Sequence, residues 1–406
     1  MHKINPRNFH RATRTTAKDI NRQIVLNLVR EYEPISRADL ARRMEVARGI
    51  LTPLVNELIE GGLIHERATG TSARGRKPVL LHVRTHDRLA IGVDVRFSQT
   101  QLMLADFSGR ALATEVMRTP ATPAELLCEL GSRIGRLVGM HAERGDCQGV
   151  GLVVPGTVDD RTGRLLNAPA LGWRNVDLRE ALSCQLGLPV YVERDAVACA
   201  QAQVWLNRRS GDSVESLAYV TVSDGVGAGL VVGGRVVRGH CGAAGEVGHL
   251  PLGLDGPACV CGARGCLEAY ASNVATVARY LGRELSTREC YAAVRDTGVT
   301  IDDVIRRARG GDDAARRALE VSAVYIGVGL GSIVNTLNPE RIVIGGEIVD
   351  AWDMVSTRVI RAMAERTQVE GTCLTPVLPE SPGEQTRLRG AAALVVAPVF
   401  AAPSVG

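Results

Sequence analysis

Aromatic residues and long apolar runs are scarce in this chain. Phe, Trp and Tyr make up 3% of the 406 residues, whereas hydrophobic residues make up 45%, so its core must be built from aliphatic side chains. No apolar run reaches the length of a membrane span, and the longest, 390–402, is interrupted by Pro398. The basic N-terminus lacks the apolar core of a signal peptide. We therefore expect a soluble intracellular protein of two or three domains with no membrane partner.

Cysteines are present but do not form a disulfide framework. Ten occur in the chain, and only three of them lie close together. Disulfide-bonded scaffolds belong to oxidising compartments and show recognisable cysteine spacings. We therefore expect reduced thiols and a cytoplasmic location. The isolated cysteines are Cys128, Cys147, Cys184, Cys199, Cys241, Cys290 and Cys373.

The three clustered cysteines follow a histidine, in the pattern Glu-x-x-His and then Cys-x-Cys-x4-Cys-x-Glu. One imidazole and three thiolates form the soft tetrahedral ligand set that suits structural zinc. Glycines between the cysteines allow a short loop to bring the sulfurs to one point. Three incidental cysteines are the alternative, but chance seldom produces this spacing. We expect a structural Zn2+ held by His249, Cys259, Cys261 and Cys266.

Positive charge is concentrated at one end of the chain. Residues 1–84 contain 16 Lys and Arg against 8 Asp and Glu, a net charge of +8, and the remainder contains 32 against 36, a net charge of −4. All three lysines lie in that first part. Such asymmetry predicts an anionic partner for the N-terminal region alone. We expect 1–17 to form a flexible basic arm.

The region 18–84 has the pattern of a winged helix-turn-helix domain. A first helix with apolar residues at helical spacing closes at Pro34, and Ser36 is placed to cap a second helix. A third helix ends near Gly61, and two strands flank the loop 69–78. In this arrangement the third helix enters the major groove of double-stranded DNA.

Several side chains of this region are candidates for DNA contact. Early residues of a recognition helix reach base edges, nearby arginines hold phosphates, and wing arginines enter narrow minor grooves. Pro53 lies inside the third helix, so that helix is either bent or begins late with Thr52 as its N-cap. The candidates are Arg48 and Thr52 for bases, Arg37 and Arg43 for phosphates, and Arg74, Arg76 and Lys77 in the wing.

From residue 85 onward, strands mix with helices over more than 300 residues, which indicates an α/β architecture in two lobes. Here the chain resembles the ROK family through Glu246-x-x-His249, the cysteine cluster ending in Glu268, and Ile342-Val343-Ile344-Gly345-Gly346-Glu347. The resemblance covers nearly the whole chain and implies an actin-like, ribonuclease-H-like body. The N-terminal region resembles that of the xylose and N-acetylglucosamine repressor branch. We expect two domains in the body: a small lobe, 85–200, and a large lobe with the zinc site, 201–406. The last helix of the second region is able to pack on the small lobe instead.

The resemblance also implies a sugar site. Asp195 takes the position of the general base in the kinases of this family, and two amide ligands of the family are replaced here by Arg194 and Ala170. Those replacements change the expected sugar specificity. The implied effector ligands are Asp195, Glu246, His249 and Glu268.

The segments that correspond to the nucleotide site depart further from the family pattern. Where the kinases have a glycine turn after the first strand, this chain has Asp94-Val95-Arg96-Phe97-Ser98, which puts side chains where phosphate must approach. The second phosphate segment, 224–229, carries Asp224, and Glu347 replaces a glycine of the adenosine segment. We therefore expect no enzyme activity, although Asp195 keeps the position of the base.

The leading hypothesis is a DNA-binding transcriptional regulator, a repressor of carbohydrate-related genes, whose kinase-like body binds a sugar or sugar-derived effector. A near-palindromic operator needs a homodimer or a higher homo-oligomer. The alternative is an ATP-dependent sugar kinase with an added DNA-binding domain. A regulator controlled by a protein partner is a third class, and no feature of the sequence marks a surface for such a partner.

Overall fold

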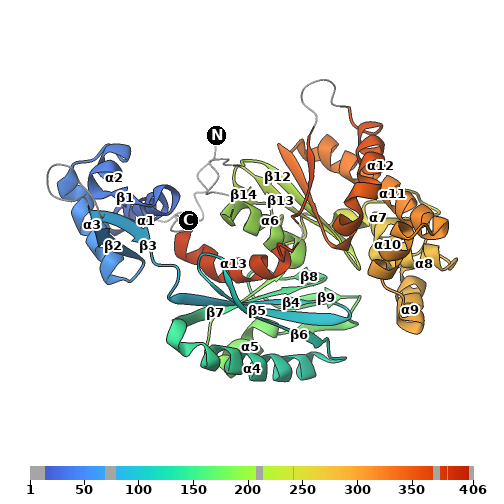
Figure 1. Cartoon of the computed structure of the whole chain (residues 1–406), viewed down its shortest axis with the longest axis horizontal. Coiled ribbons are helices and arrows are strands. Elements are labelled where there is room, and N and C mark those ends of the chain that lie inside the picture. Colours follow the sequence, from blue (N-terminus) through green and yellow to red (C-terminus); the bar gives the residue numbers. More distant parts are fainter. Residues whose placement is uncertain are drawn as a thin grey trace.

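The computed structural model of the chain describes residues 14–68, 79–206, 214–240, 242–368, 375–381 and 383–401. An N-terminal domain lies to one side of two α/β lobes, and the C-terminal helix lies between the three parts (Figure 1). This is the predicted α/β architecture in two lobes with an added N-terminal domain.

The N-terminal domain has three helices and a three-stranded sheet in the order β1–β3–β2. The Ser36 hydroxyl accepts a hydrogen bond from the amide of Asp39, which confirms the predicted cap of the second helix. The first helix begins at Arg14, so the end of the predicted arm is helical. The loop 69–78, with Arg74, Arg76 and Lys77, lies outside the described residues. The elements are α1 (Arg14–Tyr32), β1 (Ile35–Ser36), α2 (Arg37–Arg43), α3 (Arg48–Glu60), β2 (Ile64–Ala68) and β3 (Val79–Val83).

Pro53 lies inside α3, which begins at Arg48 with Ala47 as its N-cap residue. The alternative in which the helix starts late, with Thr52 as its cap, is therefore wrong. The Thr52 hydroxyl instead donates to the carbonyl oxygen of Arg48 at 2.9 Å. Because Pro53 is only the sixth residue of the helix, its missing N–H removes a single hydrogen bond near the N-terminal end.

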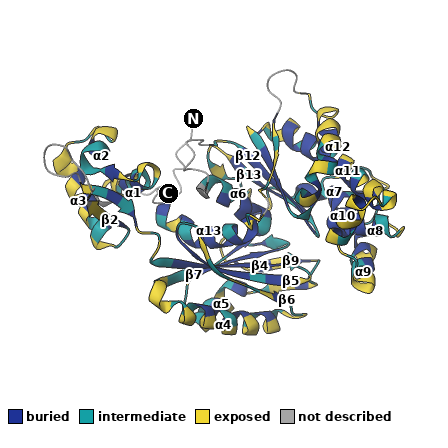
Figure 2. Ribbon diagram, in the orientation of Figure 1, coloured by how far each residue is buried: buried dark blue, intermediate teal, exposed yellow. Residues whose placement is uncertain are grey.

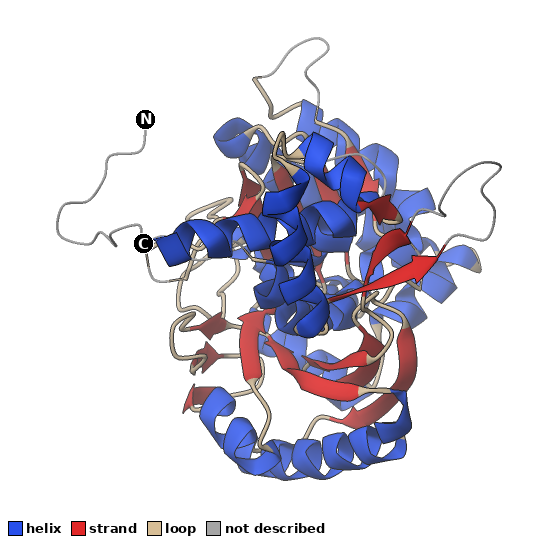
Figure 3. Cartoon of the chain, turned by 90° about the vertical axis from the view of Figure 1, so that its left-hand side faces the viewer, coloured by secondary structure: helices blue, strands red, loops and turns tan. Residues whose placement is uncertain are grey.

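The small lobe is a five-stranded sheet in the order β11–β7–β4–β5–β6 with helices on both faces. Leu126, Leu130 and Ile134 of α4 pack on one face, and Leu388, Ala392 and Val395 of α13 pack on the other. Figure 3 shows the strands between these layers. The elements are β4 (Arg88–Val95), β5 (Gln99–Asp106), β6 (Ala111–Arg118), α4 (Pro123–Met140), β7 (Asp146–Val154), α5 (Leu178–Leu186), β11 (Val190–Arg194) and α13 (Thr386–Phe400), with a small sheet of β8 (Thr157–Val158), β9 (Leu165–Ala168) and β10 (Trp173–Val176).

The large lobe repeats this plan. Its sheet has the order β14–β13–β12–β15–β16, in which, as in the small lobe, an antiparallel meander is followed by two parallel strands. The elements of the sheet are β12 (Leu217–Val222), β13 (Val226–Val232), β14 (Arg235–Val236), β15 (Arg341–Gly345) and β16 (Val377–Pro379). The helices are α6 (Asp195–Leu206), α7 (Leu267–Ala271), α8 (Asn273–Tyr280), α9 (Thr287–Thr297), α10 (Ile301–Arg309), α11 (Asp313–Leu337) and α12 (Trp352–Ala364).

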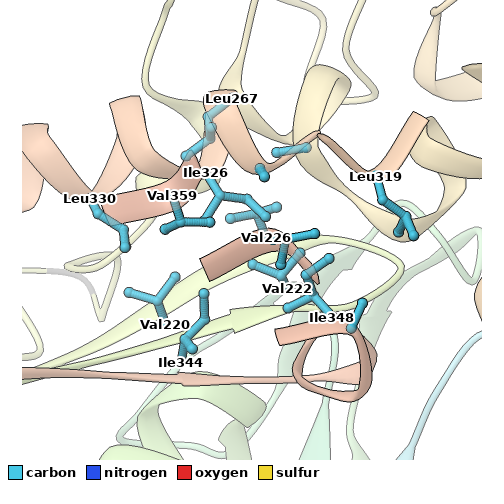
Figure 4. Close-up of a cluster of buried hydrophobic side chains, with 14 of the residues drawn as sticks. Val220, Val222, Val226, Leu267, Leu319, Ile326, Leu330, Ile344, Ile348 and Val359 are labelled. Carbon is cyan, nitrogen blue, oxygen red and sulfur yellow. The ribbon is translucent and has the colours of Figure 1, made fainter. Parts of the chain in front are cut away.

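Aliphatic side chains fill the core of the large lobe, as the scarcity of aromatic residues predicts. Val220, Val222 and Ile344 of the sheet face Ile326 and Leu330 of α11 (Figure 4). Among the described residues, α11 is the one helix long and apolar enough to cross a membrane, and 61% of its most apolar window is buried inside the protein. Figure 2 shows that the strands are mostly buried, whereas the outward faces of the helices are exposed.

Glycines allow α13 to lie directly on the small-lobe sheet. A Cβ atom on Gly92 would lie 2.5 Å from the carbonyl oxygen of Leu388, and one on Gly151 would lie 1.7 Å from that of Ala391. No side chain fits at these distances. The helix and the sheet are therefore in backbone contact, and α13 belongs to the small lobe although it is the last helix of the chain.

The far end of α13 enters the core of the N-terminal domain. Phe400 is 4% exposed and packs with Val25, Leu26 and Val29 of α1. The side-chain amide of Asn27 donates to the carbonyl oxygen of Phe400 at 2.9 Å. Such bonds satisfy the carbonyl groups that a helix leaves unpaired at its C-terminal end. The N-terminal domain is thus anchored to the body by the last turn of α13.

We expect Gly151→Ala to lower the free energy of unfolding by at least about 3 kcal/mol, because the new methyl group forces α13 off the sheet. Gly135→Ala is the matched control, since Gly135 lies exposed within α4 with nothing within 4 Å of an added Cβ. That change should stabilise the protein by up to about 1 kcal/mol. Urea unfolding measures both, and equal effects of the two substitutions would contradict the close contact.

Candidate functional site

A cleft between the two lobes collects the predicted effector residues. Asp195 lies at the start of α6, Glu246 and His249 lie around a short 3-10 helix, Val247–His249, and Glu268 lies in α7. All four line one pocket together with Arg194. The end of strand β11 in the small lobe and the loop of the large lobe that carries the cysteine cluster therefore meet in this cleft.

Asp195 is held by an arginine of the C-terminal helix. Its Oδ2 lies 2.8 Å from Nη1 of Arg387, and its Oδ1 accepts from the amide of Ala196 at 2.7 Å. The same Arg387 side chain contacts Asp94 at 2.9 and 3.0 Å. Asp94 is fully buried, which by itself would raise the pKa of its carboxyl group, but Arg387 and Arg96 outweigh burial and hold that pKa below its usual value. Sequence reasoning missed Arg387, because it lies nearly 200 residues beyond Asp195.

Arg194 and Glu246 form an ion pair inside the pocket. Nη1 of Arg194 donates to Glu246, and Nη2 donates to the carbonyl oxygen of Ala244 at 2.5 Å. The other carboxylate oxygen of Glu246 lies 3.8 Å from Nε2 of His249. The arginine that replaces the family amide thus occupies part of the pocket and already engages one predicted effector ligand.

The four predicted metal ligands converge. Their ligand atoms all lie within 4.8 Å of one another, with 3.7 Å between the sulfurs of Cys261 and Cys266 and 3.6 Å between the sulfur of Cys259 and Nδ1 of His249. A tetrahedral zinc ion about 2.3 Å from sulfur and about 2.0 Å from nitrogen requires separations of about 3.8 and about 3.5 Å. The donor set therefore fits zinc. With Nδ1 on the metal side, Nε2 of His249 is left facing Glu246.

Burial raises the pKa of the Cys259 and Cys266 thiols and of the Glu268 carboxyl group. A thiol that resists ionisation is a poor ligand by itself, and a bound cation reverses this because it stabilises the thiolate. Glu268 accepts a hydrogen bond from the amide of Val226 at 3.1 Å, so its carboxylate is fixed beside the pocket.

Ion pairs fill the region where the resemblance places a nucleotide. Nε of Arg96 donates to Asp94 at 2.7 Å, and Nη1 donates to Glu347 at 2.6 Å. The second oxygen of Glu347 accepts from Asn273 at 2.7 Å. Arg96 belongs to the small lobe and Glu347 to the large lobe, so this contact also joins the lobes. The predicted obstruction by the Arg96 side chain has a definite form: it is a salt bridge across the cleft.

The second phosphate segment is also unsuited to phosphate. Residues 226–229 lie in β13 rather than in a glycine turn. Asp224 is half-buried, and loss of hydration followed by the charge of Glu347 raises the pKa of its carboxyl group to about 6. A carboxyl group that is already destabilised by a neighbouring negative charge would repel a phosphate.

The predicted DNA-contacting residues of α2 and α3 lie on the side of the N-terminal domain that faces away from the lobes (Figure 1). Arg48 and Thr52 are exposed on α3, and exposed Ile50 and Asn56 share that helix, a pair that sequence reasoning missed. Arg37 of α2 donates to Asn56 at 2.9 Å and to Glu66 at 2.9 Å. Arg43 lies over the ring of Tyr32, 3.6 Å from its centroid. Arg37 and Arg43 are therefore held by neighbours in the unbound protein.

Residues 90–397 match the model of the ROK family. The chain belongs to the ROK family. It is 30% identical over 396 residues to the putative xylose repressor of Caldicellulosiruptor sp. strain Rt8B.4, which covers 95% of this chain and 98% of that protein. The predicted family is thereby confirmed.

Two solved structures of ROK proteins are similar to the fold described above. A ROK family transcriptional regulator, a homologue of the E. coli Mlc protein, has a TM-score of 0.78 at 28% identity and covers 95% of this chain and 97% of its own. A ROK family glucokinase from Streptomyces griseus, in complex with glucose and AMPPNP, has a TM-score of 0.64 at 30% identity, with 75% of this chain and 98% of its own covered. The similarity to the regulator extends over the N-terminal domain as well as the body of this ROK protein.

We expect Cys261→Ser to reduce the zinc content of the purified protein from one ion per chain to near zero and to abolish the response to effector. The hydroxyl is a much weaker zinc ligand than a thiolate, and the serine would leave only three strong donors. Cys128→Ser is the control, because Cys128 is exposed and stands apart from the cluster. Metal analysis and effector titration provide the measurement, and a full response without bound metal would refute this role.

Asp224→Asn should raise the free energy of unfolding by roughly 1–3 kcal/mol near neutral pH. The native pKa, about 6, exceeds the unfolded value of 3.8, so ionisation in the folded state costs stability from about pH 4 upward and fully above about pH 6. The gain should therefore vanish as the pH falls toward about 4. Urea unfolding across this range tests the sign, with exposed Asp296→Asn as the control; a gain independent of pH would contradict it.

Proposed function

We propose that this ROK protein is a sequence-specific DNA-binding transcriptional regulator, a repressor of carbohydrate-related genes, that responds to a sugar or sugar-derived effector. The observation that carries the proposal is the path of α13, which contacts the pocket through Arg387 and the N-terminal domain through Phe400. One helix thus connects the pocket with the N-terminal domain.

The exposed residues of α3 support a role in DNA binding. Arg48 offers a bidentate donor for guanine, Thr52 and Asn56 offer polar groups for base edges, and Ile50 offers an apolar contact for the thymine methyl group. Arg37 and Arg43 lie at the two ends of α2, where arginines hold phosphates and set the register of the protein on the DNA. The wing residues Arg74, Arg76 and Lys77 add charge of the right sign.

The length of α13 fits a mechanical link. Its fifteen residues span about 22 Å, and its backbone contacts with the sheet at Gly92 and Gly151 hold the helix against the small lobe. An effector that engages Asp195 competes with Arg387 for the same carboxylate. Any displacement of Arg387 is carried along the helix to Phe400, and therefore to α1.

The lobes provide the two states that such a response requires. Arg96–Glu347 and Arg194–Glu246 are ion pairs that join small-lobe residues to large-lobe residues in the present conformation. An effector that binds between the lobes favours one lobe angle over the other, and the populations shift accordingly. Its differential affinity for the two states sets the size of the response.

Sugar kinase chemistry is disfavoured by the same contacts. Asp195 keeps the position of the base, but both of its oxygens already accept hydrogen bonds, one of them from a guanidinium. Arg96 and Glu347 fill the nucleotide side of the cleft. We therefore infer a regulator without enzyme activity, and a screen of ATP with a sugar panel should give no phosphorylated sugar.

Zinc, assembly and location follow from this function. His249, Cys259, Cys261 and Cys266 would hold a structural zinc ion that fixes the ring of His249 beside Glu246. Two recognition helices one DNA turn apart require at least a homodimer. A repressor of bacterial-type operators works where the DNA is, so we place this protein in the cytoplasm.

The central test is fluorescence anisotropy of the purified protein on DNA from upstream of its own gene, with a sugar panel at fixed salt. We expect tight binding that weakens at least about 100-fold between about 50 and about 200 mM salt and that one sugar alters. Arg48→Ala should weaken binding by about 5- to 150-fold, since it removes a base contact. Arg361→Ala, on the outer face of α12, is the control.

Binding that does not distinguish this DNA from a scrambled sequence, or ATP-dependent sugar phosphorylation that is lost in Asp195→Asn, would refute the proposed function. Specific binding that every sugar leaves unchanged would retain the DNA role and refute the sugar response, in favour of control by a protein partner.

A further inference from the structure

The effector pocket contains a buried guanidinium whose hydrogen bonds are incomplete. Arg194 lines the pocket, and its side chain is 7% exposed. Its two terminal nitrogens donate to Glu246 and to the carbonyl oxygen of Ala244, but its Nε–H has no acceptor among the described residues. Buried polar groups are normally paired. An acceptor oxygen from outside the chain would complete the hydrogen bonds of this donor.

The hydroxyl group of Thr221 is in the same condition. Thr221 lies near the end of β12, is 3% exposed and lines the same pocket, and its Oγ1 has no partner among the residues that the structure describes. Two buried donors, one from each lobe, thus belong to residues that line a single cleft, and neither has an acceptor among the described residues.

Three carboxylates of the pocket each have at least one donor. Asp195 accepts from Arg387 and from the amide of Ala196, Glu246 accepts from Arg194, and Glu268 accepts from the amide of Val226. The Nε–H of Arg194 and the Thr221 hydroxyl group, by contrast, have no acceptor among the described residues. A sugar hydroxyl supplies an acceptor but brings a proton that needs an acceptor of its own.

On the basis of the proposed function, we propose that the effector is an acidic sugar, whose carboxylate or phosphate oxygens accept hydrogen bonds from Arg194 Nε and the Thr221 hydroxyl group. Anionic oxygens bring no proton, and hydrogen bonds between two charged partners are roughly twice as strong as neutral ones. A planar guanidinium also matches an oxyanion better than it matches a hydroxyl group.

Binding of an anion at Arg194 has a consequence for the metal loop. The anion competes with Glu246 for the guanidinium, and the free oxygen of Glu246 already lies 3.8 Å from Nε2 of His249. Loosening the ion pair lets Glu246 approach that imidazole. An acidic sugar thus separates Arg194 of the small lobe from Glu246 of the large lobe, which a neutral sugar has no charge to do.

The test is isothermal titration calorimetry of the zinc-loaded full chain with sugars that differ in one group: D-glucose, D-glucuronate and D-glucose 6-phosphate, and D-xylose with D-xylonate. We expect an acidic member to bind at least about 10-fold more tightly than its neutral counterpart, the effect of one charged hydrogen bond. The arm that binds distinguishes a carboxylate from a phosphate.

Arg194→Gln should weaken binding of that acid by about 10- to 100-fold and leave binding of the neutral sugar within about threefold. Arg238→Gln is the matched control, because Arg238 pairs with Glu193 beside Arg194 and does not line the pocket. Zinc content and thermal melting of both variants show whether they are folded, and Arg194→Lys, which keeps the charge without the Nε–H, should bind the acid as weakly as the glutamine variant within about threefold.

A neutral sugar that binds as tightly as its acidic counterpart would overturn the acidic-sugar proposal, and the proposed function would stand if that neutral sugar also changed operator binding. An acid whose affinity survives Arg194→Gln would overturn it as well. No binding by any of the five compounds would overturn both this proposal and the sugar response, while operator binding by anisotropy would still support a DNA-binding regulator.

Discussion

The guanidinium of Arg387 holds together three segments that lie far apart in the chain. It bonds Asp94 at the end of β4 and Asp195 at the start of α6 from its own place in the first turn of α13. A buried charge is tolerated only when its partners are complete, and here two carboxylates surround one guanidinium while Arg96 adds a second cation. The positions of β4, α6 and α13 are therefore interdependent, and a change at the pocket end of any one of them involves the other two.

The same side chains fill the nucleotide side of the cleft and join the two lobes in this ROK protein. Arg96 and Glu347 depart from the glycines that a nucleotide site needs, and together they form an ion pair that joins the lobes. Arg194 departs from an amide and joins Glu246 across the cleft. Both ion pairs are charged contacts between the lobes, so they hold the present angle between them.

Local pattern predicted much of this molecule from its sequence. The Ser36 cap and the cluster of candidate metal ligands depend on short spacings in the sequence, and the structure shows the cap and brings the four side chains together. The late start of α3 was wrong, because the helix tolerates Pro53 near its N-terminal end. The contacts of Arg387 and Phe400 and the Arg194–Glu246 ion pair could not be predicted. They connect residues 52 to almost 400 positions apart, and such separations leave no periodic pattern in the sequence.

The place of Phe400 makes the core of the DNA-binding domain depend on a helix that is synthesised after the strands of both lobes. The elements of this domain end at Val83, but its hydrophobic core is closed by Phe400 of α13. Domains usually fold in the order in which they are made, but this one cannot bury Val25, Leu26 and Val29 fully until the body that senses the effector has been completed. A chain that stops before α13 therefore lacks a complete DNA-binding domain. Every molecule that is able to bind an operator thus also contains the body that senses the effector.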